Sequence, residues 1–135
     1  MRILTNNPLV RERCGGVCPL EYVQTGYEGV LRAARDAVHR GEVLLVHPLY
    51  GSVKPRETPY RSLLLSGTEG PVDPASLEKI ETALAFCRTF PERTRVFAET
   101  ARADFARVDL ALFESGLEAA AEAGQAPAAA GRHCT

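Results

Sequence analysis

The residues best suited to chemistry lie in one long connection in the middle of the chain. Residues 47–60 read HPLYGSVKPRETPY and join two aliphatic runs, 43–46 and 63–65. Most connections between such segments are shorter. Because loops held on rigid strands commonly carry binding residues, we expect this connection to form part of a functional site.

Several side chains of this connection suit a small anion. Ser52, Lys54 and Thr58 offer N–H, hydroxyl and ammonium donors. Gly51 lets the backbone approach a ligand closely, and His47 exchanges protons near neutral pH. The glycine patterns that bind nucleotides are absent from the sequence, so a nucleotide is not indicated.

A second polar loop follows the first predicted strand, where Thr5, Asn6 and Asn7 precede Pro8. Ligands of open α/β sheets bind beyond the carboxyl ends of parallel strands. If the two loops follow neighbouring strands, their side chains converge on one cleft. The predicted ligand-binding residues are Thr5, Asn6, Asn7, His47, Gly51, Ser52, Lys54, Thr58 and Tyr60.

Structural roles would also account for these residue types. A histidine at a strand end is often only hydrogen-bonded, a lysine is usually solvated, and Asn-Asn before proline favours a turn. No serine–histidine–acid spacing or close carboxylate pair indicates a hydrolase. Catalytic residues stay unknown, and an enzyme with His47 as acid or base, assisted by Lys54 or backbone amides, is one alternative.

The cysteines do not indicate metal or redox chemistry. Cys14 and Cys18 are separated by three residues, whereas thioredoxin-like and zinc motifs use two. Cys87 falls on an apolar helical stripe and suits packing. We expect no metal and no cofactor, and the role of Cys14 and Cys18 stays open.

Composition excludes several classes of protein. The chain has 135 residues, of which 45% are apolar, and this suits one domain with an ordinary core. Its formal charge of −1 provides no field to attract nucleic acid or an anionic membrane. No apolar run reaches the roughly 18 residues of a membrane span, and the N-terminus lacks a secretory signal pattern. We therefore expect a cytoplasmic protein.

Local patterns predict both strands and helices. Thr25 is the expected cap of the first helix, which Gly41 ends. Asp73 should cap the second helix, with Pro74 at its first position. Asp109 should cap the last one. The predicted segments are strands at 2–6, 21–24, 43–46 and 63–65, a loop at 10–19 and a further helix at 93–102.

This order of segments predicts an α/β fold, a single domain with a small mixed sheet of about four strands and helices packed on it. The strands at 21–24 and 43–46 flank a helix and should be parallel, with 43–46 central because it is apolar on both faces. The strand at 63–65 should be antiparallel or non-adjacent. We place the domain at 1–118 and expect the alanine-rich tail at 119–135 to be partly disordered.

Three stretches have an unusual composition: TNNPLV at 5–10, HPLYGSVKPRETPY at 47–60 and DFARVDLALFESGL at 104–117. Together they resemble the GrdX family, over roughly residues 1–117. The resemblance implies a cytoplasmic accessory protein encoded beside the glycine, sarcosine and betaine reductase systems of amino-acid-fermenting anaerobes. It also implies proximity to a reductase that makes acetyl phosphate with a thioredoxin system. It supplies no mechanism and no catalytic residues, and the Cys14–Cys18 loop and the alanine-rich tail depart from the pattern.

The main functional hypothesis is an accessory protein that binds a small anion, such as phosphate or an acyl phosphate, between the loops at 5–8 and 47–60. Three prolines should keep the longer loop ordered and packed against the shorter one. The other alternative is a protein-interaction module that assembles a reductase complex through its tyrosines.

Overall fold

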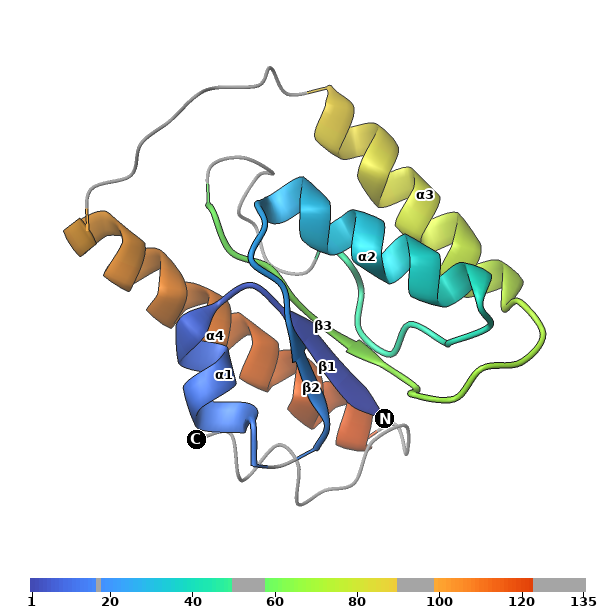
Figure 1. The fold of residues 1–135 in the computed structure, drawn as a ribbon, viewed down its shortest axis with the longest axis horizontal. Helices are drawn as coiled ribbons and strands as arrows, with labels where there is room; N and C mark the ends of the chain where they lie inside the picture. The colour runs from blue at the N-terminus through green and yellow to red at the C-terminus, as the bar shows by residue number, and fades with distance from the viewer. Residues whose placement is uncertain (17, 50–57, 90–98, 123–135) are drawn as a thin grey trace.

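The computed structural model describes residues 1–16, 18–49, 58–89 and 99–122, and the α/β class that the sequence predicts is confirmed (Figure 1). The elements in chain order are β1 (Arg2–Thr5), α1 (Pro8–Cys14), β2 (Leu20–Tyr22), α2 (Tyr27–His39), β3 (Ser62–Leu65), α3 (Pro74–Arg88) and α4 (Glu99–Glu122).

The sheet is small, open and mixed, as predicted, although its described part has three strands rather than about four. The strand order is β2-β1-β3. β1 runs parallel to β2, with Ile3 opposite Leu20, and antiparallel to β3, with Leu4 opposite Leu63. β1 is therefore the central strand, and its carboxyl end lies beside that of β2.

The aliphatic run at 43–46 is not the central strand that the sequence predicts. It lies along the outer edge of β3 and forms one antiparallel bridge, between Leu44 and Leu65. Serine side chains take two of its N–H groups: Ser66 Oγ accepts from Val43 at 2.8 Å and Ser76 Oγ accepts from Leu44 at 2.9 Å. The run is apolar because it is covered, not because strands flank it on both sides. Its antiparallel pairing with β3 is as expected.

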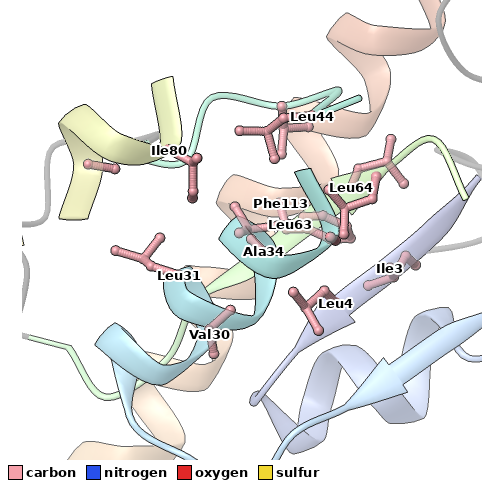
Figure 2. Packing of buried hydrophobic residues seen from close by; sticks show 14 of the residues in the cluster. Ile3, Leu4, Val30, Leu31, Ala34, Leu44, Leu63, Leu64, Ile80 and Phe113 are labelled. Carbon is pink, nitrogen blue, oxygen red and sulfur yellow. The ribbon is translucent and has the colours of Figure 1, made fainter. Parts of the chain in front are cut away.

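Helices cover both faces of the sheet. α2 packs against α3 on one face, and α1 packs against α4 on the other (Figure 1). Figure 2 shows side chains of α2, including Val30 and Ala34, on the near side of β3, with Phe113 of α4 behind it. Each fully buried aliphatic or aromatic side chain contributes about 1.5–3 kcal/mol, so this double-sided core is the main source of stability.

The sequence does not predict α1, because its residues suit a turn followed by the loop expected at 10–19. Asn7 caps the helix, because its Oδ1 accepts the N–H of Leu9 at 2.9 Å. Pro8 takes the first helical position, where the lack of an N–H has no cost. The same Asn-Pro pair that ends a strand thus also begins a helix.

Local patterns predicted two further helix boundaries correctly and one incorrectly. Asp73 caps α3 as predicted, with its carboxylate accepting the N–H of Ser76 at 3.0 Å. Gly41 follows α2 with φ of +96°, a conformation that suits glycine. The prediction for Thr25 is wrong, because the cap of α2 is Gly26 and no side chain caps that helix.

The last described segment of the chain forms one long helix, not two. α4 is continuous through Asp109, so this residue is not the cap that the sequence predicts. Residues 119–122 belong to α4, whereas residues 93–98 and 123–135 lie outside the described ranges. Among the described helices, none combines the length and apolar character needed to cross a membrane.

Candidate functional site

The connections that follow β1 and β2 leave the sheet toward opposite faces. The turn after β1 leads to α1, and the turn after β2 leads to α2 on the other side (Figure 1). Where neighbouring parallel strands send their chains to opposite faces, their carboxyl ends enclose a crevice that commonly binds ligands. The topology alone therefore predicts a ligand-binding site at this edge of the sheet.

A hollow of about 480 Å³ opens at this edge. Its walls are the turn after β1, the segment from β2 to α2, the residues before β3 and the first turns of α4. The lining residues are Asn6, Pro8, Tyr22, Val23, Gln24, Thr25, Gly26, Pro59, Tyr60 and Arg102. Within this described lining there is one charged side chain, the guanidinium of Arg102.

Asn6 ties three of these walls together and is 6% exposed. Its Nδ2 donates to the carbonyls of Thr25 and Pro59, both at 2.8 Å. Its Oδ1 accepts the N–H of Arg61 at 2.9 Å. Both donor hydrogens are thus already used, so Asn6 shapes the hollow more than it can hold a ligand.

The first turn of α2 opens onto the same hollow. Gly26 and Thr25 line it, and no side chain caps the helix. The initial N–H groups of a helix have no partner within the helix and carry a partial positive charge. Together with Arg102, they give this edge a donor-rich and positively charged character.

Behind the turn lies a ring of four buried polar side chains: Thr5, Asn7, Ser62 and Asp109. Asn7 and Ser62 each donate to Oδ2 of Asp109, at 3.0 and 2.8 Å. The hydroxyls of Thr5 and Ser62 are 2.7 Å apart, and the backbone N–H of Asn7 donates to Thr5 at 2.9 Å. Thr5 and Asn7 thus fix the turn from inside.

A family model described as GrdX-like protein matches residues 2–118. The chain belongs to the GrdX-like family. Membership supports a role as an accessory protein of glycine reductase gene clusters. Neither a curated protein nor a solved structure matches the chain.

In this GrdX-like chain, four of the predicted site residues form or support the crevice. Asn6 and Tyr60 line the crevice, while Thr5 and Asn7 support it from below. Thr58 is buried nearby, and its hydroxyl accepts the N–H of Tyr60 at 3.3 Å. The described end of the 47–60 connection therefore reaches the turn after β1, through the bond from Asn6 to Pro59.

His47 lies beside a different hollow, of about 320 Å³, formed with α3 and lined also by Leu49 and Lys79. Its Nδ1 accepts the N–H of Leu49 at 3.0 Å. Desolvation, and then the charges of Lys79 and Arg61, lower the pKa of His47, which favours the neutral imidazole. No hydrogen bond within the described ranges joins it to Thr5, Asn6 or Asn7.

Gly51, Ser52 and Lys54 lie outside the described residues, so their predicted roles stay predictions. Cys14 and Cys87 are buried, and Cys18 packs at the edge of the core. Within the described ranges, no group of three or more histidine, cysteine, aspartate and glutamate side chains could hold a metal ion.

Several contributors to the site were missed in the sequence, including Arg102 and the part of the lining that joins β2 to α2. Two more, Asp109 and Arg61, are buried behind the lining. Asp109 was interpreted as a cap, although it lies four and eight residues before the buried Phe113 and Leu117, a spacing that places it on the same helix face. Arg61 is 1% exposed, and its guanidinium lies 4.9 Å from the centre of the Tyr27 ring. Burial raises the pKa of Tyr27, against the opposing effect of Arg61.

Proposed function

We propose that this GrdX-like accessory protein binds a small anion in the crevice between the turns that follow β1 and β2. The observation that carries the proposal is the hollow at this junction, lined by the uncapped start of α2 and by Arg102. Helix starts and guanidinium groups both favour phosphate and carboxylate oxygens.

The candidate ligands are inorganic phosphate, a small carboxylate and an acyl phosphate. All three present oxygen atoms with negative charge, which N–H donors and a guanidinium recognise. The acyl phosphate is suggested by the association of the family with glycine reductase, and the hollow would hold any of the three. We place the protein in the cytoplasm, beside the reductase system.

Titration of the full chain with phosphate, acetate and acetyl phosphate tests the proposal. Binding to the native state should raise the melting temperature as occupancy increases. Arg102→Ala should weaken binding by roughly 10-fold to 100-fold, because hydrogen bonds to charged groups contribute about 1.5–3 kcal/mol. Arg107→Ala is the matched control, since Arg107 is exposed on the same helix and pairs with Asp104.

Absence of any shift with all three anions at millimolar concentration would refute the proposal, as would equal losses in the two arginine variants. The alternative of an assembly module has less support among the described residues. Their large exposed apolar side chains, Val72, Phe86 and Val108, are scattered: Val72 precedes the start of α3, Phe86 lies near the end of that helix, and Val108 lies on α4.

A further inference from the structure

The start of α4 is held against the protein by polar contacts. Arg102, Ala106 and Asp109 fall on one face of the helix, with spacings of four and three residues. The carbonyl of Ala106 and the carboxylate of Asp109 both accept from Nδ2 of Asn7, at 2.9 and 3.0 Å. The large apolar side chains of α4 that are buried begin at Leu110 and Phe113, and Phe105 before them is half-buried.

The directions of the hydrogen bonds in the ring can be assigned. A hydroxyl has one proton, and Ser62 donates its proton to Asp109 at 2.8 Å. Thr5 must therefore donate to Ser62 across 2.7 Å, while Thr5 itself accepts the backbone N–H of Asn7. Both Ser62 and Asn7 donate to Oδ2 of Asp109, so this oxygen must be an acceptor.

We propose that Asp109 is a positioning residue, which sets the register of α4 through Asn7 and thereby holds Arg102 over the crevice. The effect on ligand binding rests on the proposed function, because Arg102 is the charged group of that site. It assigns a role to Asp109 that extends beyond stability. The carboxylate acts on the ligand through the helix, two turns away from the crevice.

A shift of register would be costly at this point. Moving α4 by one residue rotates it by about 100° and translates it by about 1.5 Å. Asp109 would then lose both donors while buried, which is strongly unfavourable for a carboxylate. Ala106 has too small a side chain to fix the register by packing. Buried polar contacts that select one register are a known use of such groups.

Exchanging the partners tests the proposal. Asn7→Asp keeps the acceptor for Leu9 but sets a second carboxylate against Asp109 and the carbonyl of Ala106. Asp109→Asn keeps an oxygen that can accept from both donors, and its amide can turn to donate. The double variant therefore restores a donor–acceptor pair between positions 7 and 109.

The first measurement is hydrogen exchange of α4 without ligand. Asn7→Asp should speed exchange at amides 103–109 by about tenfold or more relative to amides 113–120, within the range for coupled neighbours. Asp109→Asn alone should change the exchange rate little. The double variant should recover part of the loss, because the carbonyl of Ala106 still lacks its donor. Asp104→Asn is the control, because it makes the same chemical change at an exposed site of α4.

The second measurement is the affinity for inorganic phosphate. The affinity should fall in Asn7→Asp, change little in Asp109→Asn and recover in part in the double variant. Unchanged exchange in Asn7→Asp, or no recovery in the double variant, would overturn the proposal. If Asn7→Asp does not fold, Asp109→Leu replaces it and should loosen amides 103–109 selectively. If the unmodified chain binds no anion, the proposed function fails, whereas the exchange pattern still decides whether Asp109 sets the register.

Discussion

The two ends of β1 are fixed by different kinds of interaction. At its carboxyl end, Thr5 and Asn7 belong to a ring of buried side chains with one carboxylate at its centre. At its amino end, Arg2 pairs with Glu42 through two bonds of 2.9 Å and with Glu21 through one of 2.8 Å. The structure of the carboxyl end depends on the placement of hydrogen-bonded groups, and that of the amino end depends on ion pairs.

The two ends also differ in how far their polar side chains are exposed to water. Glu21 is 55% exposed and Arg2 is 19% exposed, so water and salt reach the charged end. The exposed Glu21 can move without leaving a buried partner unsatisfied, although Glu42 is itself buried. The ring at the other end excludes water, so each member requires its own partner in place. The crevice lies at the end where positions are held most strictly.

Ser62→Ala should give the largest loss of stability among these tests. It removes the donor to Asp109 and the acceptor for Thr5, and a buried polar group left without a partner costs about 1–3 kcal/mol. Urea unfolding at pH 7 measures the change. Ser66→Ala is the comparison at the charged end, where water can replace the half-buried hydroxyl that accepts from Val43. Equal losses in the two variants would remove the distinction between the ends.

Glu42→Gln should cost about 1–2 kcal/mol at pH 7, because it removes the charge that pairs with Arg2 in a partly buried site. The loss should shrink as salt is added, since Arg2 is partly exposed. Glu69→Gln, at an exposed glutamate close to Arg40, should change stability by less than about 0.5 kcal/mol. A loss at Glu42 that salt does not alter would contradict the ionic description of this end.

The stability that Glu42 contributes should depend on pH. The hydrogen bond from Arg2 is the largest cause that lowers the pKa of Glu42 from its ordinary 4.5. A lowered pKa stabilises the fold above 4.5, and this contribution is lost as the pH falls through the folded value. The difference between the unmodified chain and Glu42→Gln should therefore be constant near neutrality and decrease below pH 4.5. A difference that grows on acidification would show the opposite sign.

Arg102→Ala should have the smallest effect on stability, within about 0.5 kcal/mol, because the side chain is exposed at the rim of the crevice. Thermal unfolding without ligand measures this change. The result separates residues that hold the crevice from residues that face it. A loss as large as that of Ser62→Ala would place Arg102 among the structural groups.

The sequence predicts those features that depend on neighbours along the chain. The α/β class, the Asp73 cap and the stop at Gly41 all follow from short patterns. The pair Asn7 and Pro8 was ambiguous, because the same two residues suit a turn and a helix start. The aliphatic run at 43–46 correctly indicated burial, but its neighbours are serine hydroxyls that no periodicity reveals.

The site itself was only half predictable. Thr5, Asn6 and Asn7 were identified because polar residues after a strand suggest a binding loop. Asp109 could not be assigned its role, since its donors lie far away in the chain and aspartate is locally a good cap. His47 and Asn6 line different hollows, because β3 lies between β1 and the run at 43–46 that precedes His47.

The separation of Asn7 and Asp109 by 102 positions has a consequence for how the protein is made. At synthesis rates of about 5–20 residues per second, Asn7 waits roughly 5–20 s before its partner exists. β1, α1 and β2 are close in sequence and can associate early, whereas the ring closes only when α4 arrives. The end of the sheet that carries the crevice is therefore the last to mature, and a nascent chain lacks it until α4 has been synthesised.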